Sequence, residues 1–220
     1  MNTVDDFFAA LETRLSPADG PGSLRLSEAE QRLRDLYRVT YPGLDEATIV
    51  AALDSSKFGA RDTDTYRAFL RAASYKALDC CGLIEFCSTA SSDRWIRDSL
   101  RFRGDLDTTR YFAVGFDPAT SAVFCLHRLV LSGEPVVSIV DQGVVLESAF
   151  SSFAALLRVL TVLLNTDVVL YVERGAAISA EQRRLVAALC AADPDGFGRV
   201  GWPAWFRRAM GDGSLEGEGP

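Results

Sequence analysis

Hydrophobic positions in the first 82 residues recur at the three- and four-residue spacing of amphipathic helices. In the first such segment, Val4, Phe7, Phe8, Leu11 and Leu15 fall on one face. The N-terminal part of the chain is therefore expected to be mainly helical. The pattern predicts helices at residues 4–15, from the capping box Ser27/Glu30 to Pro42, at 45–53, and at 65–81 before Gly82.

After Gly82 the hydrophobic spacing changes from that of helices to that of strands. The segment 122–131 is apolar almost throughout, which predicts a central strand covered on both faces. Its connections to the neighbouring strands are too short for parallel crossovers, so an antiparallel meander is expected. The strands predicted here are 83–86, 111–116, 122–131 and 136–140, and residues 93–102 fit either a short helix or a strand.

Helical spacing returns near residue 148, where Ser148 or Ser151 is expected to start a largely hydrophobic helix that ends at Leu164. Ser179 and Gln182 form a second capping box. The remaining C-terminal predictions are a strand or helix extension at 168–172, a turn at 193–196, a short helix at 202–210 and a disordered tail at 211–220.

Together these elements predict one α+β domain over residues 1–210. An antiparallel sheet of about residues 110–140 is expected to pack with several helices, and the part at 1–82 is expected to be mainly helical.

The net charge of −7 and the pI of about 4.8 argue against a general nucleic-acid binder, which needs a basic face. They are compatible with a basic protein partner. The most apolar stretch, at 150–164, is too short for a membrane span, and residues 1–15 lack the order of a signal peptide. With five scattered cysteines, the expected setting is the reducing cytoplasm, with no membrane contact.

Candidate catalytic chemistry is sparse. His127 is the only histidine, and its place in an apolar run predicts a partly buried ring on a strand. No phosphate loop, nucleophile elbow or zinc-binding spacing occurs, so neither a cofactor nor a metal is expected. An enzyme that uses Cys125 or His127 is therefore the weakest of the three functional hypotheses, and the other two follow below.

Four segments of the C-terminal half carry a resemblance to a known family. They are Tyr-Phe-Ala-Val-Gly-Phe-Asp at 111–117, Val-Phe-Cys-Leu at 123–126, residues 144–157 with Ser148, Phe150, Ser151 and Phe153, and Cys-Ala-Ala-Asp-Pro at 190–194 followed by Trp202 and residues 207–213. In this order they resemble the SUKH superfamily of bacterial immunity proteins, in particular its fourth immunity subgroup. Residues 83–210 would form the SUKH-like core.

The resemblance implies a non-enzymatic protein that binds a secreted polymorphic toxin and neutralises it by direct contact. Such toxins are often nucleases or nucleic-acid deaminases, whose substrate grooves are basic. Residues 111–173 contain six acidic and two basic residues, which suits a basic partner. The candidate contacts, placed at turns and strand ends, are Asp117, Glu134, Asp141 and Glu147. The second hypothesis is a regulatory or scaffolding module of the same fold, bacterial or viral.

Overall fold

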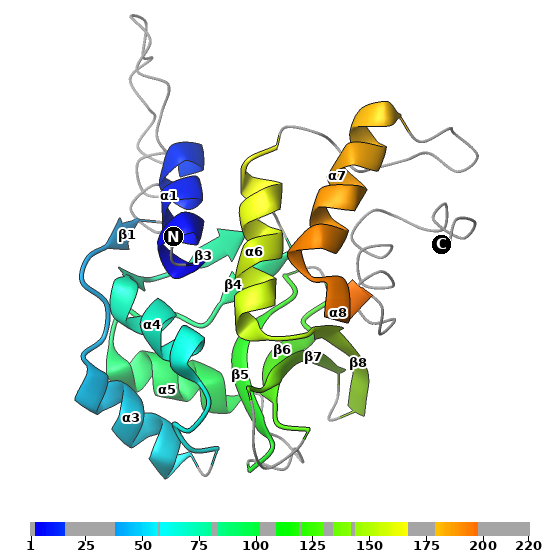
Figure 1. The fold of residues 1–220 in the computed structure, drawn as a ribbon. Helices are drawn as coiled ribbons and strands as arrows, with labels where there is room; N and C mark the ends of the chain where they lie inside the picture. The colour runs from blue at the N-terminus through cyan, green and yellow to red at the C-terminus, as the bar shows by residue number, and fades with distance from the viewer. Residues whose placement is uncertain are drawn as a thin grey trace, which may run out of the picture.

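The computed structural model shows an α+β fold, as predicted, with a six-stranded antiparallel sheet, a two-stranded sheet and flanking helices (Figure 1). It describes residues 3–15, 38–56, 58–80, 83–101, 109–118, 120–129, 134–141, 144–166 and 179–197. The helices in these ranges are α1 Thr3–Leu15, α3 Glu46–Ser55, α4 Asp64–Ala72, α5 Ser92–Arg101, α6 Phe153–Leu164, α7 Ala180–Ala192 and α8 Pro194–Phe197.

The large sheet is an up-and-down meander in which each strand pairs with its neighbours in sequence. Its strands, in chain order and in spatial order, are β3 Leu78–Cys80, β4 Ile84–Phe86, β5 Tyr111–Phe116, β6 Val123–His127, β7 Val136–Asp141 and β8 Val144–Phe150. The predicted meander is confirmed. So is the central strand, because every residue of β6 is buried, although β6 is shorter than the predicted 122–131.

The end of the meander differs from the prediction. Residues 144–150 form β8, paired with β7, whereas a helix was expected from Ser148 or Ser151. The helix α6 starts only at Phe153, where the side chain of Ser152 caps it by accepting a hydrogen bond from the Ala155 amide. The serines around position 150 therefore mark a corner between strand and helix, and the first of them still belongs to the strand.

The predicted helix at 65–81 is wrong in its second half, because α4 ends at Ala72. The amides of Gly43 and Leu44 donate to the carbonyls of Arg71 and Leu70, at 2.8 Å and 2.9 Å, and so cap the helix from another segment. Only glycine fits at 43, since a Cβ there would lie 2.1 Å from the Leu70 carbonyl oxygen. Beyond Ala72 the chain forms β2 Ser74–Tyr75 and then β3.

Strand β1 Val39–Thr40 pairs with β2 in the two-stranded sheet, so the helix expected from Ser27 does not extend to Pro42. The ambiguous segment 93–102 overlaps α5, so it is a helix, and the expected turn at 193–196 overlaps the single helical turn α8. The start of the Ser27 helix, the segment 168–172, the helix at 202–210 and the tail at 211–220 lie outside the described residues.

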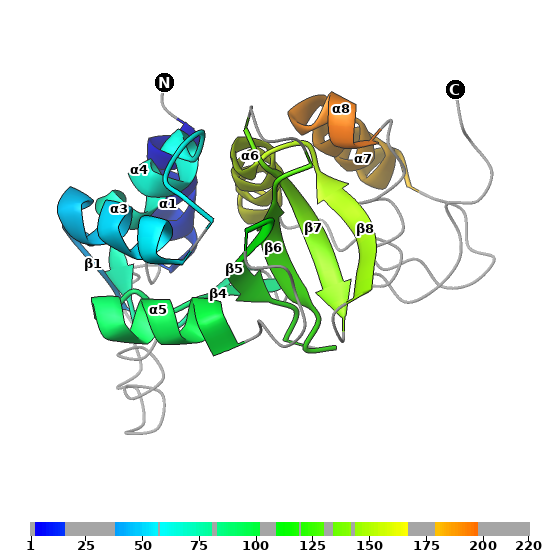
Figure 2. The ribbon, with the colours of Figure 1, turned by 90° about the horizontal axis from the view of Figure 1, so that it is seen from below.

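The sheet has two different faces. Figure 2 shows α6 against one face, with α1, α3 and α4 grouped beside it. Phe112, Phe124, Leu126, Val137 and Ile139 of this face join the main core. The opposite face carries a smaller buried cluster, formed by Ala113, Val123, Cys125 and Val140.

An aromatic cluster joins the N-terminal helices to the sheet. The ring centroid of Phe153, at the start of α6, lies 4.9 Å from that of Tyr66 and 5.3 Å from that of Phe69, and both of these residues are on α4. The ring centroid of Phe69 in turn lies 5.0 Å from that of Phe86 on β4. A continuous hydrophobic core therefore runs from α1 through α4 and the sheet to α6 and α7.

We predict that Phe153→Ala lowers the free energy of unfolding by about 3–5 kcal/mol, because the side chain is 1% exposed and its ring contacts cannot be replaced. Urea unfolding measures this loss. The control is Leu129→Ala, an exposed site, where we expect a change of about 0.5 kcal/mol or less. A loss below about 1 kcal/mol for Phe153→Ala would contradict this packing.

Candidate functional site

The structure separates the four acidic residues that the sequence singled out. Asp117 follows β5 and Asp141 ends β7, and the strand register places both at the same end of the sheet. Glu134 precedes β7 and lies at the opposite end. Glu147 lies within β8, paired with Ile139, and not at a turn or strand end as expected.

The register adds two carboxylates to the end that holds Asp117 and Asp141. Asp79 of β3 pairs with Glu85 of β4, and Glu85 pairs with Phe116, the residue before Asp117. The same transverse line continues through Val123 to Val140, the residue before Asp141. We call Asp79, Glu85, Asp117 and Asp141 the acidic row. Each of these residues is exposed or half-buried.

Sequence reasoning missed Asp79 and Glu85 because it placed Asp79 in a helix. The alternation of buried and exposed residues in Leu78-Asp79-Cys80, followed by Ile84-Glu85-Phe86, was the available signal for two short strands. Paired antiparallel residues point to the same face, so the two carboxylates lie side by side.

Asp117 also shapes the turn that carries it. Its carboxylate accepts hydrogen bonds from the Thr120 hydroxyl, at 2.6 Å, and from the Thr120 amide, at 3.4 Å. Its backbone exchanges hydrogen bonds with Ser121 and Ala122. These hydrogen bonds between Asp117 and residues 120–122 stabilise the turn that joins β5 to β6. Asp141 is exposed, and no ion pair joins it to another described residue.

Glu134 has a different environment from the acidic row. Partial burial raises the pKa of its carboxyl group, while a hydrogen bond with the Thr65 side chain opposes this rise. The positive charge of Arg158 also opposes the rise, because it favours the charged form of Glu134. Glu134 therefore connects the β7 end of the sheet to the start of α4, which is a contact within the chain.

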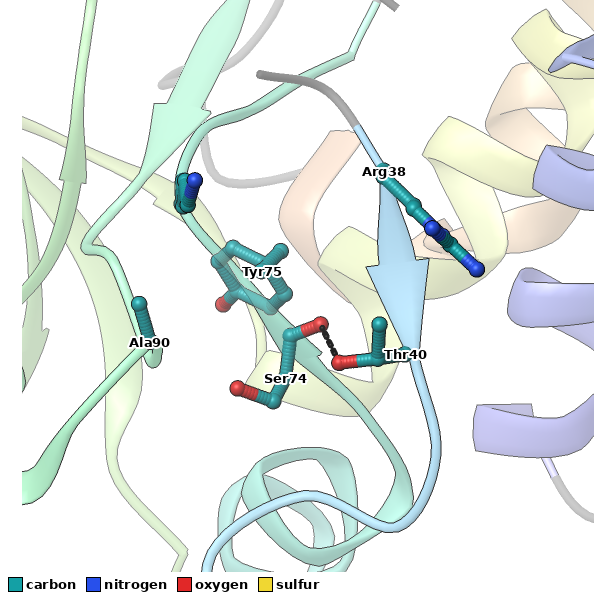
Figure 3. A pocket seen from close by; sticks show the side chains of 6 residues that line it. Arg38, Thr40, Ser74, Tyr75 and Ala90 are labelled. Carbon is teal, nitrogen blue, oxygen red and sulfur yellow. Dashed lines mark hydrogen bonds between the residues drawn. The ribbon is translucent and has the colours of Figure 1, made fainter. Parts of the chain in front are cut away.

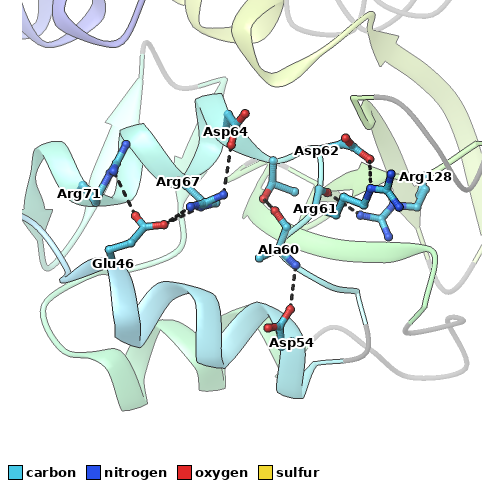
Figure 4. Close-up of polar contacts among 10 residues, drawn as sticks. Glu46, Asp54, Ala60, Arg61, Asp62, Asp64, Arg67, Arg71 and Arg128 are labelled. Carbon is cyan, nitrogen blue, oxygen red and sulfur yellow. Dashed lines mark hydrogen bonds and ion pairs between the residues drawn. The ribbon is translucent and has the colours of Figure 1, made fainter.

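Charged residues of α3 and α4 likewise form ion pairs within the chain (Figure 4). Glu46 forms ion pairs with both Arg67 and Arg71, and Arg67 also contacts Asp64 at 3.1 Å. On the other side of this region, Arg128 donates to the backbone carbonyls of Phe58 and Arg61 at 2.7 Å and 2.9 Å. These side chains hold elements together, and we do not count them as a binding surface.

A buried carboxylate ties the β8–α6 corner to the C-terminal helices. Asp193, which is 0% exposed, accepts hydrogen bonds from the amide and hydroxyl of Ser151 and from the Gly196 amide. Close by, Arg158 donates to the Ala192 carbonyl at 2.8 Å. Asp193 was expected in a turn, and its role as a buried acceptor was not predicted.

We predict that Asp193→Ala lowers the free energy of unfolding by about 2–4 kcal/mol, because it leaves the buried Gly196 amide and the half-buried donors of Ser151 without their acceptor. Ser151→Ala should cost less, about 1–2 kcal/mol. A double-mutant cycle followed by urea unfolding tests whether the two side chains interact. The loss of unfolding free energy in the double variant should be smaller than the sum of the two single losses by about 1 kcal/mol or more. Strictly additive losses would show that the two side chains do not interact.

His127 lies on β6, a strand as predicted, and it is buried, whereas a partly buried ring was expected. Its Nδ1 atom is 2.9 Å from the hydroxyl oxygen of Ser138, and the ring stacks on Tyr111 with 4.3 Å between ring centroids. Burial, helped by the nearby charge of Arg110, lowers the pKa of His127. A serine next to an imidazole is the arrangement of a nucleophile and its base, but Ser138 is 0% exposed, so no substrate reaches its hydroxyl in this conformation.

The lowered pKa predicts a specific pH dependence of stability. Below about pH 6.5 the unfolded chain takes up a proton on His127 before the folded chain does, so this group reduces stability as the pH falls. His127→Gln removes that contribution. Between about pH 7.5 and about pH 5.5, the free energy of unfolding should therefore fall less in His127→Gln than in the wild type. An equal or steeper fall in the variant would contradict a neutral, buried imidazole.

The described part of the chain contains neither a candidate metal site nor a candidate membrane-spanning helix. No three His, Cys, Asp or Glu side chains there are grouped so as to hold a metal ion. No helix among the described residues combines the length and apolar character needed to cross a membrane. Burial raises the pKa of the Cys125 thiol, which keeps it protonated and unreactive at neutral pH.

Comparisons with known proteins add no relative: no family model, no curated protein and no solved structure matches the chain.

Proposed function

We propose that this protein is a non-enzymatic immunity protein of the SUKH superfamily, acting in the cytoplasm, that binds a cognate basic toxin and blocks it by direct contact. The observation that carries the proposal is the acidic row, which places Asp79, Glu85, Asp117 and Asp141 along one end of the sheet. A toxin that acts on nucleic acid presents positive charge around its active site, because its substrate is a polyanion. An acidic surface suits such a partner.

The residues that resemble the SUKH family occupy positions on which this fold depends. Gly115 of β5 pairs with Phe86 of β4, and a Cβ at position 115 would be 2.6 Å from the Glu85 carbonyl oxygen. Ser151 and Asp193, which belong to two separate segments of the resemblance, contact each other. Matched residues that are far apart in sequence thus meet in one structure, which supports the family proposal.

The placement of the row suits electrostatic steering. The residues lie in short strands and at turns of a sheet, and the other described positions on the same line are the half-buried Phe116 and the buried Val123 and Val140. Loops at a sheet end tolerate sequence change without loss of the core, so related proteins with the same fold could recognise different partners there. Charges on such a rim mainly raise the rate of association and fix the orientation of the partner.

The test uses Asp79→Lys combined with Asp141→Lys, two exposed positions of the row. The binding partner is the protein encoded directly upstream, in a catalytically inactive form. We expect the double variant to associate about tenfold or more slowly than the wild type at low salt, and the difference to shrink at high salt because the charges are screened. Neutralisation of the active toxin in cells should weaken in parallel.

The matched control is Asp5→Lys combined with Glu181→Lys, which changes the net charge equally at exposed sites on α1 and α7. If the control slows association as much as the row variant, net charge alone acts and the row is not the contact surface. Failure of the upstream protein to bind, with capture of a non-toxic partner through the row, would favour the scaffolding hypothesis. Loss of function in a folded His127→Gln variant would favour an enzyme.

A further inference from the structure

We draw no further inference here: the strongest candidate, the polar pocket of about 420 Å³ lined by both strands of the two-stranded sheet and by Ala90, carries none, because Arg38 is directed away from Thr40 and Ser74 (Figure 3) and nothing in the described part of the chain marks a ligand there.

Discussion

The packing of α6 on the sheet is the constraint on which the other features of this molecule depend. Phe153 begins α6, is 1% exposed, and contacts aromatic rings of α4 and β4. These contacts fix the helical N-terminal elements to the face of the meander that α6 covers, and leave the opposite face to a smaller cluster. The acidic row lies on the sheet that this packing holds in place.

The corner before α6 shows how polar groups complete this packing. The chain leaves β8 and enters α6 within two residues, Ser151 and Ser152, and each satisfies a different partner. Ser152 caps α6 itself, while Ser151 bonds the buried carboxylate of Asp193 at the end of α7. Hydrophobic burial supplies most of the stability, and these hydrogen bonds specify where strand and helix meet.

Much of the fold was predictable because long elements have strong periodic patterns. The helices α1, α3, α6 and α7 and the strands β5, β6 and β7 were all expected from hydrophobic spacing and caps. The errors occurred where distant segments decide the local structure. Helix α4 ends at Ala72 because Gly43 and Leu44 cap it from outside, and β8 forms because β7 offers an edge to pair with. Neither cause can be read from the residues in the element itself.

The candidate site was only partly predictable for the same reason. Asp117 and Asp141 were chosen as turn residues and do lie at the same end of the sheet, on strands separated by β6, but Asp79 and Glu85 are added to this end only through strand pairing. Charge counts identified the sign of the surface, whereas pairing between strands determined which charges are neighbours.

The central claim is that the acidic row contacts the partner, and hydrogen–deuterium exchange of the protein with and without the upstream gene product tests it most directly. The account predicts slower exchange in the complex at the β5–β6 and β7–β8 connections and in β3, with little change in α7. Protection confined to α7, with unchanged exchange along the row, would contradict it.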